Sequence, residues 1–104
     1  MQNSPRIVKL MPKAESDLDD IFEYLCGFSF EIGHKYFNLI LDGLFKLEEN
    51  ADIYPYVRNE QLRAEKVKWM AINNYTVFFT IHNESKTVLV RRILYAKRNY
   101  PDLI

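Results

Sequence analysis

The chain has 104 residues, of which 48% are apolar and 14% aromatic, and its formal net charge at pH 7 is zero. This composition excludes an intrinsically disordered chain, and the length is typical of one domain, spanning residues 1–104. With a single cysteine, no apolar leader and no apolar run of about 18 residues, the sequence predicts a soluble cytoplasmic protein that makes no membrane contact.

The charged residues divide unevenly along the sequence. Residues 1–62 contain 6 Lys and Arg against 11 Asp and Glu, a net charge of −5, whereas residues 63–104 contain 8 against 3, a net charge of +5. This asymmetry predicts an anionic partner for the C-terminal part, a partner that recognises both signs of charge, or mutual neutralisation of the two parts within the fold.

The N-terminal half is predicted to form one strand and two helices. The run RIVKL at residues 6–10 predicts the strand, which Pro12 ends while suiting the first turn of a helix. Apolar residues at helical spacing predict helices over residues 13–25 and 32–47. Because Gly27 separates them by a short link, the two helices are expected to form an antiparallel hairpin.

The C-terminal half is predicted to form three strands. Residues 49–60 contain Asn, Asp and Pro and are expected to be a loop. Strands follow at residues 66–72, 75–81 and 87–95, joined by short turns that imply an antiparallel meander. The order β-α-α-β-β-β predicts an α+β fold in which the helical hairpin packs on one face of a small antiparallel sheet.

The face of the sheet that the helices leave open is predicted to carry positive charge. Alternation in the middle strand places its more polar set on this face: Thr76, Phe78 and Thr80. Arg91 and Arg92 must point to opposite faces, so one of them lies on the open face. The other members of this predicted basic concavity are Lys66, Lys68, Lys97 and Arg98, with Tyr75, Tyr95 and Tyr100 nearby. Such a surface suits a single-stranded nucleic acid and an acidic protein segment equally well.

Common catalytic motifs are absent from the sequence. One cysteine and two separated histidines, His34 and His82, do not have the spacing of metal ligands. Three glycines form neither a phosphate-binding loop nor a nucleophile elbow. We therefore expect no metal and no cofactor.

Four segments of the sequence carry a family resemblance. They are VKLMPKAESDLDDIFEYL, GLFKLEENADIYP, NNYTVFFTIHNESKTV and VRRILYAKRNYPDLI. Together they resemble the RelE/ParE superfamily, the toxins of bacterial type II toxin–antitoxin modules. The resemblance covers nearly the whole chain and agrees with the predicted element order. It implies a small cytoplasmic toxin that an antitoxin encoded beside it holds inactive, through an amphipathic and acidic segment.

The resemblance implies one of two mechanisms. RelE-like toxins enter the ribosomal A site and cut mRNA without a metal, whereas ParE-like toxins inhibit DNA gyrase. Lys68 corresponds to the strand lysine of the RelE-like nucleases, Arg98 to their tail arginine and Tyr100 approximately to their terminal aromatic residue. The favoured prediction is therefore a ribosome-dependent mRNA endoribonuclease in which these three residues are catalytic.

One departure from the nuclease pattern lies in the middle strand. The family's arginine is replaced by Thr76, so RNA cleavage would have to recruit another arginine to stabilise the phosphate. The residues predicted to bind the substrate are Arg63, Lys66, Tyr75, Arg91, Arg92 and Lys97. Two alternatives stay open, namely a ParE-like gyrase inhibitor without nuclease activity and a degenerate toxin that only binds its antitoxin.

Overall fold

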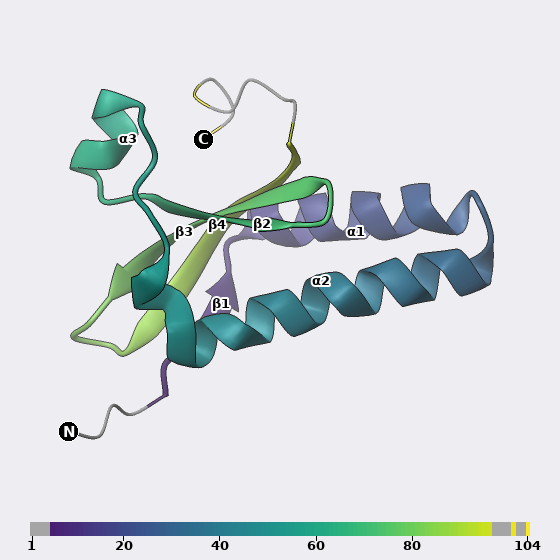
Figure 1. Cartoon of the computed structure of the whole chain (residues 1–104), viewed down its shortest axis with the longest axis horizontal. Coiled ribbons are helices and arrows are strands. Elements are labelled where there is room, and N and C mark those ends of the chain that lie inside the picture. The colour runs from purple at the N-terminus through teal and green to yellow at the C-terminus, as the bar shows by residue number, and fades with distance from the viewer. Residues whose placement is uncertain (1–4, 97–100, 102–103) are drawn as a thin grey trace.

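The structure is a computed structural model that describes residues 5–96, 101 and 104. Its elements, in chain order, are β1 (Ile7–Leu10), α1 (Pro12–Cys26), α2 (Phe30–Asn50), the 3-10 helix η1 (Ala51–Ile53), α3 (Glu60–Ala64), β2 (Lys68–Ile72), β3 (Tyr75–His82) and β4 (Thr87–Tyr95). The hairpin of α1 and α2 packs on one face of the sheet and extends well past the end of its strands (Figure 1). The predicted α+β class and helical hairpin are confirmed.

The helical hairpin follows from local sequence signals. Pro12 lies at the start of α1, where its missing N–H costs no hydrogen bond. Ser29 begins α2, because its hydroxyl oxygen accepts the backbone N–H of Ile32 at 3.0 Å. Near the hairpin link Gly33 is buried against α1, and a Cβ there would lie 2.9 Å from the Cα of Cys26. A glycine is thus what lets the two helix backbones approach at this point.

The sheet contains four strands in the order β1-β4-β3-β2. Strands β2, β3 and β4 form the predicted antiparallel meander, with Asn73 in the left-handed conformation (φ 52°) at the first turn. Strand β1, however, pairs in parallel with β4, so the sheet is mixed and not antiparallel throughout as predicted. Apolar alternation indicates which side chains face the core, but it carries no information about which edge a strand joins or in which direction.

The main hydrophobic core lies between the hairpin and the sheet. Ile40 and Leu47 of α2 and Val77 and Phe79 of β3 are completely buried in it. Phe78 points to the opposite face, as predicted, and lies in a second cluster. The other buried members of that cluster are Val57, Leu62, Val67 and Leu94. The face of the sheet away from the hairpin is therefore partly covered, and not open as predicted.

The segment between α2 and β2 supplies this cover. It was predicted as a loop over residues 49–60, but it contains η1 and leads into the short helix α3. Asn59 caps α3, because its side-chain oxygen accepts the backbone N–H of Leu62 at 3.0 Å. Leu62 then buries its side chain in the second cluster. Among the described residues, no helix is long and apolar enough to cross a membrane.

Candidate functional site

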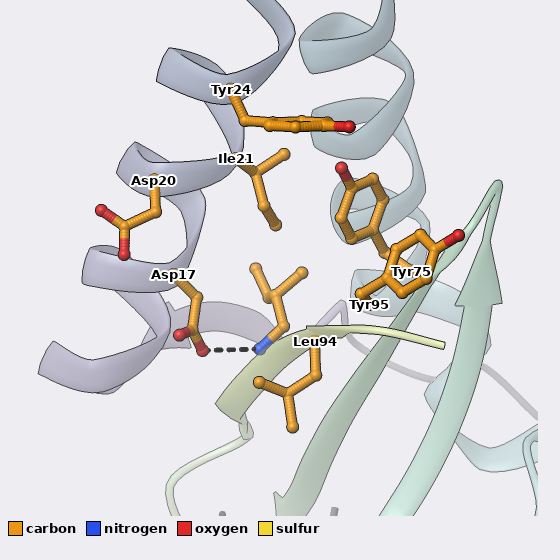
Figure 2. A pocket seen from close by; sticks show the side chains of 8 residues that line it. Asp17, Asp20, Ile21, Tyr24, Tyr75, Leu94 and Tyr95 are labelled. Carbon is orange, nitrogen blue, oxygen red and sulfur yellow. Dashed lines mark hydrogen bonds between the residues drawn. The ribbon is translucent and has the colours of Figure 1, made fainter. Parts of the chain in front are cut away.

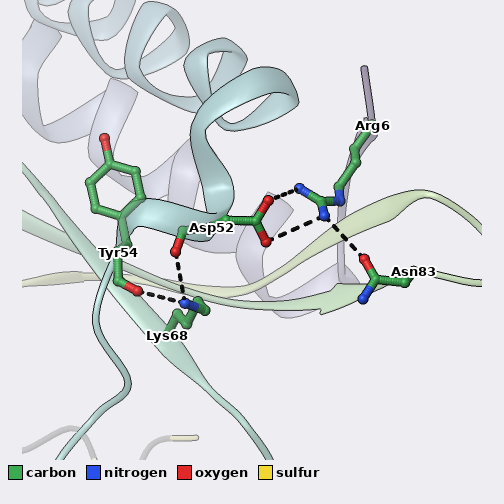
Figure 3. Close-up of polar contacts among 5 residues, drawn as sticks. All are labelled: Arg6, Asp52, Tyr54, Lys68 and Asn83. Carbon is green, nitrogen blue, oxygen red and sulfur yellow. Dashed lines mark hydrogen bonds and ion pairs between the residues drawn. The ribbon is translucent and has the colours of Figure 1, made fainter. Parts of the chain in front are cut away.

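Lys68, the predicted strand lysine of an RNA-cleaving site, lies inside the protein. It pairs with Phe79 of β3, which places it on the helix-covered face, and the residue is 9% exposed. Its Nζ donates to the carbonyl oxygens of Tyr54 at 2.6 Å and Asp52 at 3.2 Å (Figure 3). The same Nζ lies 4.5 Å from the ring centroid of Tyr56. Two of the three ammonium donors thus hold the backbone that follows α2.

Polar contacts around η1 tie three parts of the chain together. Arg6 donates to the carboxylate of Asp52 at 2.8 and 3.3 Å and to the amide oxygen of Asn83 at 3.0 Å (Figure 3). Because the Asp52 side chain is 63% exposed, this ion pair stabilises the fold by at most about 1 kcal/mol. Lys66 and Lys68 border a cavity of about 330 Å³ at the same end of the sheet. These two lysines are therefore neighbours, as predicted.

A β-bulge in β4 decides where the two adjacent arginines point. Arg91 is the extra residue, since Phe78 pairs with Arg92 and Phe79 pairs with Val90. Arg91 points away from the hairpin, toward α3, where its Nη1 donates to the carboxylate of Glu65 at 2.9 Å. The two arginines contact different elements: Arg91 contacts Glu65 at the end of α3, and Arg92 contacts Asp17 of α1. The regular alternation on which their predicted placement rested is interrupted by the bulge.

Arg92 lies under helix α1 and forms a two-pronged ion pair with Asp17. Its Nε and Nη2 donate to the two carboxylate oxygens of Asp17 at 2.7 and 2.8 Å. The backbone N–H of Ile93 donates to the same carboxylate at 3.0 Å. Both side chains are mostly buried, with exposed fractions of 16% and 13%. The hydrogen bonds to Asp17 raise the pKa of Arg92 above its ordinary value, so this guanidinium stays charged at any physiological pH.

The described residues do not form the single basic concavity that was predicted. Lys68 lies opposite Phe79, four residues along β3 from Tyr75, which is a separation of about 13 Å along the strand. Tyr75 and Tyr95 pair at the other end of the sheet, and Arg63 is exposed on α3. The predicted tail residues lie outside the described residues: Lys97, Arg98 and Tyr100. Alternation predicts the face that a side chain takes, but not its distance from charges on other elements.

An aromatic groove, which sequence reasoning missed, lies where the hairpin extends past the sheet. We define this aromatic groove by the six residues Tyr24, Phe28, Ile32, Tyr36, Tyr75 and Tyr95. Two adjoining cavities of about 400 and 630 Å³ make up its space, and they share the walls formed by Tyr24, Tyr75 and Tyr95. Figure 2 shows Tyr24 extending from α1 over this space, with Tyr75 and Tyr95 across from it.

The length of α2 relative to β2 is the feature that could have indicated this groove. Helix α2 has 21 residues and spans about 32 Å, whereas β2 has 5 residues and spans about 17 Å. The apolar stripe of α2 begins at Ile32 and Tyr36, and these residues line one cavity together with Asn73 and Asn74 of the β2–β3 turn. Because α2 is longer than the edge strand β2, its first turns extend past the sheet and leave apolar side chains uncovered (Figure 1).

Tyr75 connects the groove to the core and is expected to titrate at unusually high pH. Burial raises the pKa of its hydroxyl, and the nearby hydroxyls of Tyr24 and Tyr95 raise it further. The unfolded chain therefore loses this proton at a lower pH than the folded chain does. The resulting contribution to stability is complete below about pH 10 and is lost as the pH rises through the folded-state pKa.

We therefore predict that raising the pH from 7 into the alkaline range lowers the free energy of unfolding of the wild-type chain more than that of Tyr75→Phe. The measurement is the free energy of unfolding by urea at a series of alkaline pH values, together with the ultraviolet titration of the tyrosines. Two stability curves that fall in parallel through the alkaline range would contradict the assignment to Tyr75.

Comparisons with known proteins agree with this architecture. A family model of the ParE toxin of the type II toxin–antitoxin system parDE matches residues 8–100. The solved chromosomal ParDE system from P. aeruginosa contains a chain with 18% identity and a TM-score of 0.73, and the match covers 91% of this chain and 100% of that one. The toxin–antitoxin complex RelBE2 from Mycobacterium tuberculosis contains a chain with 16% identity and a TM-score of 0.65, and the match covers 88% of this chain and 98% of that one.

The two structural matches are too low in identity to indicate more than a shared fold. The search among curated proteins found no match. The family model, in contrast, matches the sequence from the second residue of β1 to beyond the end of β4, which is most of the chain. The chain therefore belongs to the ParE toxin family, within the RelE/ParE superfamily, and is the toxin component of a type II toxin–antitoxin system.

Proposed function

We propose that this toxin inhibits DNA gyrase by binding to it and does not cleave RNA. The observation that carries the proposal is the position of Lys68. Its ammonium group is buried on the helix-covered face and donates to the carbonyl oxygens of Asp52 and Tyr54. A lysine that transfers a proton during RNA cleavage must reach the 2′-hydroxyl or the leaving oxygen of the substrate. Lys68 would have to give up both hydrogen bonds to do so.

The arginines expected to replace the missing middle-strand arginine support the same proposal. Arg92 is paired with Asp17 below α1, and Arg91 is paired with Glu65 beside α3. Each lost donor aimed at the developing charge typically lowers a rate by about 10²- to 10³-fold. A phosphate would have to displace a carboxylate before either arginine could act. The match to the ParE family model supports the second of the two mechanisms that the resemblance implies, in which ParE-like toxins inhibit DNA gyrase.

Expression of the chain without its antitoxin is expected to stop growth while transcripts stay intact and double-strand DNA breaks accumulate. The purified chain is expected to inhibit the supercoiling activity of gyrase. Lys68→Met should retain this inhibition, although two carbonyl oxygens that lose their donor lower the free energy of unfolding by about 1–3 kcal/mol. Thermal melting of the variant shows whether it is folded at the assay temperature.

The competing nuclease hypothesis assigns proton transfer to Lys68 or Tyr100, and phosphate binding to Arg98 together with Arg91 or Arg92. It predicts cut mRNA on isolated ribosomes and loss of cutting in folded Lys68→Met and Arg98→Ala. Observation of that pattern would overturn the gyrase proposal. Harmless expression of the folded chain in the absence of any antitoxin would instead identify a degenerate toxin.

A further inference from the structure

A further cavity lies on the face of the sheet away from the hairpin, beside the second cluster. Its volume is about 300 Å³, which suits an inserted side chain. We call it the Trp69 cavity and define it by six of its lining residues: Val57, Arg58, Trp69, Thr76, Phe78 and Leu94. Trp69 is 38% exposed, whereas Phe78 and Leu94 are each 3% exposed. The cavity therefore has a buried apolar floor and an exposed aromatic wall.

Small side chains in the middle of the sheet leave this space open. Thr76 lies in a row across three strands, between Ala71 of β2 and Leu94 of β4. The neighbouring row pairs Trp69 with Phe78. Because Ala71 and Thr76 are much smaller than these two aromatic residues, the space above them stays open beside the Trp69 ring. Thr76 also replaces the arginine of the RelE-like nucleases, so an apolar cavity lies where those enzymes carry a cation.

Exposed cations lie at the Trp69 cavity and on the segment beside it. Residues 57–71 contain 4 Lys and Arg against 2 Asp and Glu, a net charge of +2. Lys68 among them is buried, and Glu65 is paired with Arg91. Among the residues that the structure describes, no ion pair involves the three exposed cations of this segment, namely Arg58, Arg63 and Lys66. A partner that covers the cavity is therefore bound more tightly if it presents carboxylates.

The hairpin carries the opposite charge, and this difference bears on which side of the molecule meets gyrase. Residues 12–50 contain 3 Lys against 9 Asp and Glu, a net charge of −6. Gyrase acts on DNA, whose phosphates repel an acidic surface and attract a basic one. An approach to the complex of gyrase and DNA through the hairpin is therefore disfavoured, and an approach through the opposite face is favoured.

We propose that the Trp69 cavity is the gyrase-binding site of this toxin and takes one apolar side chain of an acidic gyrase segment. This side chain contacts Trp69 and the buried floor, and a carboxylate beside it pairs with Arg58. Tryptophans and arginines at such positions commonly contribute most of the binding energy of an interface. The inference rests on the proposed function, because it names the surface through which the toxin inhibits gyrase.

Two other occupants fit the Trp69 cavity less well. A single-stranded nucleic acid needs several cations for its phosphates, whereas the described lining of the cavity contains one, Arg58. In a two-fold symmetric dimer through this face, the exposed cations of the two copies would meet and repel one another. An acidic protein segment with an apolar anchor has neither conflict.

Truncation of Trp69 tests the aromatic wall of the cavity. Trp69→Ala is expected to raise the toxin concentration that half-inhibits DNA supercoiling by gyrase about 10- to 30-fold. The control is Phe45→Ala, since Phe45 is an aromatic residue of α2 that is 61% exposed and does not border the cavity. This control is expected to change the concentration less than about twofold. Equal effects of the two truncations would overturn the assignment of Trp69.

Filling the cavity tests the same site without removing a contact. Thr76→Leu places a larger apolar side chain at a half-buried position of β3 and is expected to raise the half-inhibiting concentration at least about tenfold. Thermal melting is expected to show that the variant is folded at the assay temperature. A folded Thr76→Leu that inhibits gyrase as well as the wild-type chain does would overturn the proposal.

Charge reversal tests the electrostatic part of the proposal. Arg58→Glu is expected to raise the half-inhibiting concentration about three- to tenfold and to weaken its dependence on salt. Arg63→Glu makes the same change at an exposed arginine of α3 that does not border the cavity, and it is expected to have a smaller effect. Equal effects would indicate only long-range attraction and would overturn the assignment of Arg58.

Measurements without gyrase show whether another occupant fills the cavity. Calorimetric titration with the cognate antitoxin is expected to give dissociation constants for Trp69→Ala and Thr76→Leu within about threefold of the wild-type value. A loss of antitoxin affinity as large as the loss of gyrase inhibition would assign the cavity to the antitoxin and overturn the proposal. Conversion of a dimer to a monomer by Trp69→Ala, seen by analytical ultracentrifugation, would assign it to a second copy.

The supercoiling assay also distinguishes failure of this inference from failure of the proposed function. If the wild-type chain inhibits gyrase and the folded cavity variants inhibit it equally well, only the inference is wrong. If the wild-type chain does not inhibit gyrase at all, the proposed function is wrong, and gyrase is excluded as the occupant of the cavity.

Discussion

Replacing Asp17 by alanine is expected to lower the free energy of unfolding by about 2–4 kcal/mol. The substitution leaves the Arg92 guanidinium, which is 16% exposed, without its carboxylate partner. It also removes the acceptor of the backbone N–H of Ile93. Removal of a carboxylate that is paired with a mostly buried charge is among the few causes of large single-residue effects, and the partial exposure places the value below that of a fully buried pair. Urea denaturation followed by circular dichroism measures the change.

Two further variants separate the ion pair from a general effect on α1. Asp19→Ala removes a carboxylate at an exposed position of the same helix and is expected to change stability by less than about 0.5 kcal/mol. In the double variant, Arg92→Met added to Asp17→Ala removes the guanidinium that has lost this carboxylate and should recover part of the loss of stability. If Asp17→Ala lowered the free energy of unfolding no more than Asp19→Ala does, the Asp17–Arg92 ion pair would make no contribution to stability.

Gly33→Ala is expected to lower the free energy of unfolding by up to about 3 kcal/mol. The new Cβ would lie 2.9 Å from the Cα of Cys26 and 3.0 Å from its backbone nitrogen. Both atoms belong to the backbone of α1, so relief of the contact requires the two helices to move apart. Such a movement disturbs the core that the hairpin forms with the sheet. Chemical denaturation again gives the change in stability.

Gly43→Ala is the matched control for the substitution at Gly33. It lies on the same helix, and its new Cβ would approach the terminal methyl group of Ile72, a side-chain atom that can turn away. The gain of about 0.5–1 kcal/mol from replacing glycine within a helix then offsets much of the cost. Adding Cys26→Ala to Gly33→Ala should recover little of the lost stability, because the contacts of the new Cβ with the backbone atoms of residue 26 persist. Full rescue would show that only the Cys26 side chain is in the way.

Local signals in the sequence predicted most of the secondary structure correctly. Strand β4 has the predicted bounds, and α1 differs from the prediction by one residue at each end. The missed helix α3 has only five residues and is set by one capping side chain, Asn59, and one buried residue, Leu62. Periodicity does not detect so short an element. The parallel pairing of β1 was missed because strand direction depends on the path of the whole chain.

The predicted site was less accurate than the predicted fold. Alternation placed Phe78 on the face away from the hairpin, and this placement is confirmed. Arg91 and Arg92 contact different elements, but they lie at a β-bulge that alternation does not predict. Lys68, however, lies on the helix-covered face, and the aromatic groove was not predicted at all. Hydrogen bonds between Lys68 and the carbonyl oxygens of a distant turn leave no pattern in the sequence. The roles of Arg98 and Tyr100 remain predictions for the experiments above.

By itself, the sequence determined the order of the longer elements, the inward face of β3 and the resemblance to the RelE/ParE toxins, because these depend on local composition and spacing. Only the tertiary structure decided which charges are neutralised and which surface is uncovered. Asp17 meets Arg92 across 75 positions of sequence, and the hairpin extends past the end of the sheet (Figure 1). Such contacts depend on distances between elements, which the spacing of residues along one element does not contain.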